Sequence, residues 1–106
     1  MEASPAVFTR IWEFRCRDDR AAEFKAAYGA DGAWARLFRR GAGYLGTELL
    51  ESTVDPARHI TIDRWESAAA WQAFLAAWRD YYAALDRASA ELTADEADLG
   101  EFHSGE

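Results

Sequence analysis

The fold is decided by two stretches, Tyr-Leu-Gly-Thr-Glu-Leu-Leu-Glu (residues 44–51) and Arg-His-Ile-Thr-Ile-Asp-Arg-Trp (residues 58–65). Both are rich in Leu, Ile, Thr and aromatic residues, which favour strands. The connection between them, residues 52–57, contains the turn-forming residues Ser, Thr, Asp and Pro. The pattern predicts an antiparallel hairpin at the centre of the chain.

Successive side chains of a strand point to opposite faces of a sheet. In the second strand His59, Asp63 and Trp65 therefore share one face, whereas Ile60 and Ile62 share the other. One face thus brings together an imidazole, a carboxyl group and an indole. We expect any chemistry of the protein to begin on that face.

The first part of the chain is predicted to contain a strand and two short helices. Residues 7–16 form the strand. Asp18 or Asp19 caps the first helix, since a carboxylate can accept the free amide hydrogens of a first turn. Phe24 and Tyr28 lie on the buried side of this helix. Glycines then interrupt the helical pattern before it resumes, which predicts two helices in series.

The last part of the chain is predicted to contain one long helix and a final strand. Ser67 caps the helix, and its apolar positions from Trp71 to Leu85 form one continuous buried face. The segment Thr-Ala-Asp-Glu (residues 93–96) matches a capping box and predicts a short turn. Residues 98–104 then form the last strand.

The order strand, helix, strand, strand, helix, strand is typical of a ferredoxin-like domain. We therefore expect an α+β fold, βαββαβ, with a four-stranded antiparallel sheet and the helices on one face. The other face, with Ile60 and Ile62, would be open to water in a monomer, so we expect a homodimer that pairs two sheet faces. The chain contains no repeat or linker, which predicts a single domain over residues 1–106 with a core of about residues 7–103.

Composition excludes several classes of protein. The 106 residues include 12 Lys plus Arg against 19 Asp plus Glu, a net charge of -7, which disfavours nucleic acid and anionic membranes as partners. No apolar run is long enough to span a bilayer, and the first residues lack the pattern of a signal peptide. We therefore expect a cytoplasmic protein. Five Trp, four Tyr and six Phe predict an apolar pocket, an oligomer interface or both.

The sequence shows no cofactor or metal motif in its proper context. Gly-Ala-Gly-Tyr-Leu-Gly (residues 41–46) satisfies G-x-G-x-x-G, but a predicted helix precedes it and a strand follows, which reverses the dinucleotide geometry. His59 and His103 are the only histidines, and with Cys16 they have no spacing typical of metal ligands. We therefore expect neither a cofactor nor a metal.

Asp63 is the first candidate catalytic residue, because a partly desolvated carboxylate beneath the helices could act as a base or a hydrogen-bond acceptor. The alternative is a salt bridge to Arg10, Arg15 or Arg36. His59 is the second candidate base. Its alternative is a strand residue at the solvent edge, where its charge is easily hydrated.

Aromatic side chains are predicted to form a pocket for a flat aromatic ligand by stacking on it. Trp65 and Tyr44 are the best candidates, since they stand at strand ends near loops. Trp71 and Trp78 have a helical spacing, for which a place in the hydrophobic core is the alternative. The predicted substrate-binding residues are Trp65, Trp12, Tyr44, Tyr28, Phe74 and Trp78.

Several segments resemble the antibiotic biosynthesis monooxygenase (ABM) domain family. They are Ile-Trp-Glu-Phe-Arg, Ala-Trp-Ala-Arg-Leu-Phe-Arg-Arg, Gly-Tyr-Leu-Gly-Thr-Glu-Leu-Leu, Ile-Thr-Ile-Asp-Arg-Trp-Glu-Ser and Leu-Thr-Ala-Asp-Glu-Ala-Asp-Leu-Gly-Glu-Phe. The resemblance covers about residues 7–102, and its most distinctive part is the strand that ends in Trp65. It implies a dimeric α+β barrel built from ferredoxin-like protomers, in which Trp65 matches a pocket tryptophan.

The resemblance implies several activities. Some members of the family oxidise polycyclic aromatic compounds to quinones with molecular oxygen and no metal or flavin, whereas others degrade heme or act on small quinones. The axial histidine of the heme-degrading branch has no counterpart here, because the corresponding helix has Phe74 and its apolar neighbours in that region. The asparagine on the first strand of that branch is also missing, since the chain contains none.

The leading hypothesis is a cofactor-independent monooxygenase that acts on a small aromatic substrate, either quinol-like or polycyclic. Asp63, or else His59, would remove a proton so that the substrate itself reduces oxygen. One alternative is a dimeric ligand-binding or stress-associated module that keeps the fold without the chemistry. A further alternative is heme binding through a tyrosine or His59.

Overall fold

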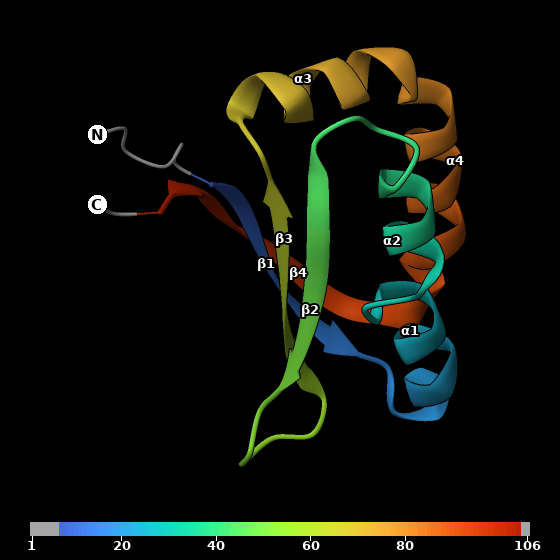
Figure 1. Cartoon of the computed structure of the whole chain (residues 1–106). Helices are drawn as coiled ribbons and strands as arrows, with labels where there is room; N and C mark the ends of the chain where they lie inside the picture. Colours follow the sequence, from blue (N-terminus) through green and yellow to red (C-terminus); the bar gives the residue numbers. More distant parts are fainter. Residues whose placement is uncertain (1–6, 105–106) are drawn as a thin grey trace.

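A computed structural model describes residues 7–104. Four strands, β1 (Phe8–Cys16), β2 (Tyr44–Glu51), β3 (Arg58–Trp65) and β4 (Thr93–His103), form one antiparallel sheet in the order β2-β3-β1-β4. The helices are α1 (Ala21–Tyr28), α2 (Ala33–Phe38), α3 (Ala68–Ala77) and α4 (Arg79–Ser89), with short 3-10 turns η1 (Asp18–Arg20) and η2 (Ala90–Leu92). All helices lie on one face of the sheet and leave the other face without a helix (Figure 1). The chain therefore has the predicted ferredoxin-like α+β fold.

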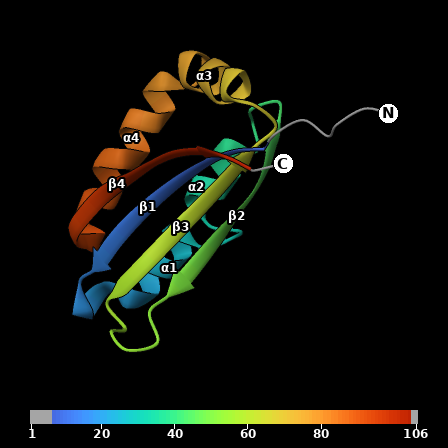
Figure 2. The same cartoon turned by 90° about the vertical axis from the view of Figure 1, so that its left-hand side faces the viewer.

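The hairpin of β2 and β3 begins and ends at the predicted residues. The register places Thr47 of β2 opposite Asp63 of β3. The side chains of His59, Asp63 and Trp65 are buried beneath the helices, whereas Ile60 and Ile62 on the other face are partly exposed. The predicted alternation of β3 is confirmed. Figure 2 shows β3 and β1 in the middle of the sheet, between β2 and β4.

The predicted long helix is divided into α3 and α4. The backbone leaves the helical region at Trp78, with φ -118° and ψ 23°, and the two helix axes run in different directions (Figure 1). Trp71 on α3 packs against Trp65 with ring centroids 5.5 Å apart, while Tyr82 on α4 packs against Trp34 at 4.9 Å. A bend in the helix allows both contacts, so tertiary packing overrides the high helix propensity of this segment.

The predicted turn at residues 93–96 is wrong, because these residues begin strand β4. Thr93 pairs with Cys16 of β1, so the capping pattern is overridden by the pairing of two strands distant in sequence. The predicted cap at Asp18 or Asp19 is also wrong. Both residues lie inside the turn η1, and α1 begins after it without a side-chain cap.

The core is an aromatic cluster between the sheet and the helices. Phe38 of α2 lies at its centre and contacts Trp65, Trp71 and Phe74 with ring centroids 5.4 to 6.0 Å away. Phe24 and Tyr28 lie on the buried side of α1, as predicted. Within residues 7–104, no helix has the length and apolarity needed to cross a membrane.

We expect the Ser67→Ala variant to lower the free energy of unfolding by about 1 kcal/mol. The Ser67 hydroxyl accepts a hydrogen bond from the backbone N–H of Ala70 at 3.0 Å and caps the first turn of α3. Urea denaturation gives the difference. The control is Thr53→Ala in the exposed β2–β3 loop, which should stay within about 0.5 kcal/mol of the parent protein. Equal effects of the two variants would show that the cap contributes nothing specific.

Candidate functional site

A cavity of about 120 Å³ lies between the sheet and the helices. Its walls are mainly aromatic and come from β1, α1, α2, α3 and α4. The aromatic lining residues are Trp12, Phe14, Tyr28, Trp34, Phe38, Trp71 and Tyr82. Its polar lining residues are Thr47, Thr61, Asp63, Asp86 and Glu96. Asp86 on α4 and Glu96 on β4 are exposed, so the cavity opens to solvent between these two elements.

Asp63 is the buried carboxyl group of the cavity, with only 7% of its surface exposed. The Thr47 hydroxyl donates a hydrogen bond to Asp63 Oδ1 at 2.6 Å, and the Tyr44 hydroxyl lies 2.5 Å from the same threonine oxygen. Burial raises the pKa of Asp63 from 3.8 to about 6, although the Thr47 hydrogen bond and the charge of Arg10 act in the opposite direction. A carboxylate with this pKa is ionised at neutral pH and is a stronger base than an exposed aspartate.

The salt-bridge alternative for Asp63 is wrong. Arg10 forms ion pairs with two carboxylates of β4, and Arg15 forms one with a carboxylate of the β2–β3 loop. Arg36 donates to a backbone carbonyl of the α1–α2 loop at 2.8 Å. Within residues 7–104, no cation lies within ion-pair distance of Asp63, so a hydroxyl group is its hydrogen-bond partner.

His59 lies outside the cavity, and its predicted place at the solvent edge is wrong. Its side chain is 1% exposed and packs on the ring of Phe24, with centroids 4.8 Å apart. His59 Nδ1 is 3.2 Å from the Ala57 carbonyl oxygen, and Nε2 is 3.4 Å from a Glu51 carboxylate oxygen without forming a hydrogen bond. Helix α1 covers the end of β3, which the hairpin pattern alone did not reveal.

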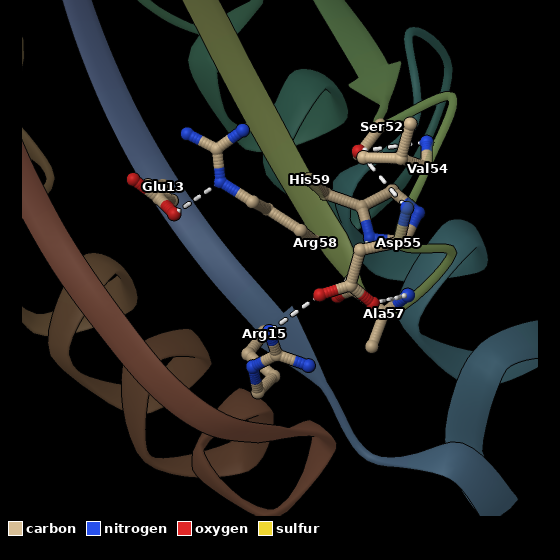
Figure 3. Close-up of polar contacts among 8 residues, drawn as sticks. All are labelled: Glu13, Arg15, Ser52, Val54, Asp55, Ala57, Arg58 and His59. Carbon is tan, nitrogen blue, oxygen red and sulfur yellow. Dashed lines mark hydrogen bonds and ion pairs between the residues drawn. The ribbon is translucent and has the colours of Figure 1, made fainter.

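The loop between β2 and β3 is held in place by its own polar contacts (Figure 3). The Ser52 hydroxyl accepts hydrogen bonds from the backbone N–H groups of Val54 and Asp55, at 3.2 and 3.1 Å. Asp55 accepts a further bond from the Ala57 N–H and pairs with Arg15 of β1. These contacts fix the hairpin end and hence the position of His59, but they do not reach the cavity.

Of the predicted substrate-binding residues, Trp12 and Tyr28 line the cavity. Trp65 is 0% exposed and, together with Phe74, belongs to the hydrophobic core behind the cavity. Tyr44 lies one hydrogen bond away, through Thr47. The lining does not include Trp65, Phe74, Tyr44 or Trp78.

Several lining residues of the cavity are not evident from the sequence pattern alone. The helical spacing of Trp71 leaves a pocket wall and the core open as alternatives, and the structure shows both: Trp71 packs in the core and lines the cavity. Thr47 could have been found from the hairpin, because it lies opposite Asp63 once the register is known. Tyr82 and Asp86 are spaced i, i+4 on α4 and share one side of that helix. Glu96 was assigned to a turn, which hid its place on β4.

The chemistry of the site depends on a single buried carboxylate in an aromatic cavity. The Thr47 hydroxyl, in contact with the Tyr44 hydroxyl, orients this carboxylate, and the exposed lining residues Asp86 and Glu96 lie on α4 and β4. Within residues 7–104, no group of three His, Cys, Asp or Glu side chains could hold a metal ion. The arrangement suits proton transfer to Asp63 from a small aromatic molecule.

A family model described as antibiotic biosynthesis monooxygenase matches residues 7–88. The chain has no match among curated proteins. Among solved structures, it is similar to a candidate antibiotic biosynthesis monooxygenase from Deinococcus radiodurans, with 18% identity over 94% of this chain and 93% of that chain and a TM-score of 0.74. It is also similar to SnoaB, a cofactor-independent oxygenase from Streptomyces nogalater, with 23% identity over 95% of each chain and a TM-score of 0.67. At these identities, the structural similarities show the fold alone.

We expect the Asp63→Asn variant to lose less stability than the parent protein between pH 4 and pH 8. The difference in free energy of unfolding, variant minus parent, should therefore be more favourable to the variant at pH 8 than at pH 4. The folded state keeps the Asp63 proton up to a pKa of about 6, whereas the unfolded state loses it near 3.8. The contribution of Asp63 to stability is therefore greatest below pH 4 and falls as the pH rises through this window. The variant removes this loss, which is about 3 kcal/mol for a pKa raised from 3.8 to about 6.

Urea denaturation of both proteins at pH 4, 5, 6, 7 and 8 measures this difference. The Asp19→Asn variant, which removes an exposed carboxylate, is the matched control. Parallel stability curves for Asp63→Asn and the parent protein would contradict the assignment of a raised pKa to Asp63.

Proposed function

The chain belongs to the antibiotic biosynthesis monooxygenase family, and from this premise we propose that it oxidises a single-ring dihydroxyaromatic substrate with molecular oxygen and no cofactor. The observation that carries the proposal is the buried Asp63 carboxylate in the aromatic cavity. The similarity in fold to SnoaB, a cofactor-independent oxygenase, supports the reaction class.

The volume of the cavity limits the size of the substrate. An apolar cavity of about 150 Å³ binds benzene, and the cavity here is about 120 Å³. The cavity therefore has room for no more than one ring, with one hydroxyl directed at Asp63 and any further substituent directed toward the opening between α4 and β4. A quinol-like substrate meets this limit, whereas a polycyclic one would need the helices to move.

In the proposed reaction, the Asp63 carboxylate removes a phenolic proton from the bound ring. The resulting phenolate is electron-rich, and a ring carbon that carries hydrogen donates electrons to oxygen and forms a C–O bond. The proton on Asp63 passes to the outer oxygen and gives a ring hydroperoxide. The O–O bond then breaks, and the outer OH leaves as water with the hydrogen of that carbon. The products are a quinone and one water molecule, so the dihydroxyaromatic substrate supplies all the electrons.

Other residues have supporting roles in this proposal. The Thr47 hydroxyl, backed by Tyr44, orients the Asp63 carboxylate. Trp12 and Trp71 line the cavity and hold the ring by stacking. Trp65 packs on Tyr44 with ring centroids 5.2 Å apart, so we assign it a positioning role behind the site. His59 has no path to the cavity, which leaves Asp63 as the proposed base.

A ligand-binding module without catalysis is the second candidate function, because the small cavity could hold one ring without further chemistry. The small volume of the cavity disfavours heme binding, since a porphyrin with four pyrrole rings exceeds that volume. His59, the histidine considered as a heme ligand, is buried against Phe24.

We expect Asp63→Asn to reduce turnover of single-ring hydroquinones and catechols at least about 100-fold, the range typical of a lost general base. Oxygen uptake and quinone absorbance measure the rate. Asp95→Asn, which removes an exposed carboxylate from β4, is the control and should retain the parent rate. Quenching of tryptophan fluorescence without oxygen uptake in the parent protein would instead support the module, and equal rates in all three proteins would exclude Asp63 as the base.

The chain is further proposed to form a homodimer through the face of the sheet that carries no helix (Figure 1). Two large apolar side chains of the edge strands, Leu50 and Phe102, are exposed. Ile60 and Ile62 of β3 lie between these edges and are partly exposed. Pairing of two such faces would remove this apolar surface from water.

We expect Ile62→Glu to convert the dimer into a monomer, because it would bury a charge in the paired faces. Sedimentation equilibrium at micromolar concentrations measures the mass. Val54→Glu, at a side chain that is 90% exposed in the β2–β3 loop, is the control and should remain dimeric. A monomeric parent protein would refute the dimer.

A further inference from the structure

We infer that the cavity selects a ligand with a cationic amine attached to its aromatic ring by a short chain. This inference deepens the proposed function, on which it rests for the identity of the substrate. Its starting point is the uneven charge of the lining. Asp63 lies inside the cavity, Asp86 and Glu96 lie at its mouth, and the lining includes no Lys, Arg or His.

The buried carboxylate provides evidence beyond the acidic character of the mouth. Asp63 is 7% exposed, and the one hydrogen bond that it accepts goes from Thr47 to Oδ1. Within residues 7–104, Oδ2 accepts no hydrogen bond and is free for a ligand. One oxygen of the buried carboxylate is thus left to accept a hydrogen bond from a ligand.

Arg10 is the positive charge that lowers the pKa of Asp63, and two carboxylates outside the cavity pair with it. Its guanidinium group lies over the rings of Trp12 and Trp71, 5.1 and 5.8 Å from their centroids. It also pairs with Asp98 at 3.2 Å and Glu101 at 3.4 Å. Two carboxylates therefore balance one cation, and the three carboxylates of the cavity keep their negative field.

The carboxylates at the mouth of the cavity raise the pKa values of neighbouring acidic groups, including two tyrosines. Partial desolvation raises the pKa of Glu96, and the charge of Asp86 adds to the effect. Burial also raises the pKa values of Tyr28 and Tyr82 to about 12, with smaller contributions in the same direction from Asp86 and Glu96. An ammonium group at the mouth would relieve the repulsion between the two carboxylates, whereas an anion would increase it.

The aromatic walls add to this preference. A cation near the face of a Trp or Tyr ring is attracted by the ring quadrupole, and the effect grows when the cation is desolvated. Tyr82 and Asp86 lie on the same side of α4, next to the opening. A ring bound in the cavity would therefore direct a two-carbon or three-carbon amine chain toward Asp86 and Glu96.

Binding of three matched probes tests the inference without any turnover. Phenethylammonium, 2-phenylethanol and 3-phenylpropionate carry a positive, a neutral and a negative group on the same ring, and none has a ring hydroxyl for the proposed oxidation. Titration calorimetry or tryptophan fluorescence at pH 7.5 and low salt gives their dissociation constants. We expect phenethylammonium to bind about tenfold more tightly than 3-phenylpropionate, with the alcohol between them.

The double variant Asp86→Asn with Glu96→Gln should reduce this preference several-fold, and so should 0.5 M NaCl. Asp95→Asn, which removes an exposed carboxylate of β4 outside the cavity, should leave it unchanged. Equal or tighter binding of the anion, or a preference that survives the double variant, would overturn the inference.

A second measurement separates this inference from the proposed function. Oxygen uptake is compared for 2-(3,4-dihydroxyphenyl)ethylamine and 3-(3,4-dihydroxyphenyl)propionate. Preferential binding of phenethylammonium without oxygen uptake from either catechol would leave the cation site standing and refute the oxygenase. Equal oxidation of both catechols would support the oxygenase and refute selection by charge.

Discussion

The pairing of β2 with β3 is the constraint on which the rest of the structure depends. Its register puts Thr47 opposite Asp63 and gives the buried carboxyl group its hydrogen-bond donor. The same register turns Trp65 toward the helices, where Phe38, Trp71 and Phe74 pack around it. A shift by one residue would move the acid and the indole into solvent and place Ile60 and Ile62 beneath the helices.

Much of the fold could be predicted from the sequence, because its signals are local. The alternation of residues 58–65 and the turn residues before them gave the hairpin, and Ser67 marked the start of α3. The bend at Trp78 had no such signal, since alanine-rich segments on both sides favour helix. It results from contacts between α3, α4 and the rest of the core. The early start of β4 likewise comes from pairing with β1, a partner distant in sequence.

The site was predicted in part for the same reason. Asp63 was identified because the periodicity of a strand tells which face a residue shares. The aromatic residues were harder to assign, because a core and a cavity wall use the same side chains at the same spacing. Trp65 and Trp71 show this: the first is entirely core, while the second serves both purposes. The way the helices pack on the sheet decides which aromatic rings border the cavity and which are fully packed in the core.

One strand, β3, separates two environments. Its odd-numbered residues from His59 to Trp65 face the helices, and the even-numbered residues between them face the opposite side. Mutations at positions 61 and 63 can therefore change the ligand without altering the residues that would meet a second subunit, and mutations at 60 and 62 can do the reverse. Such a division lets evolution diversify recognition and assembly independently within eight consecutive residues.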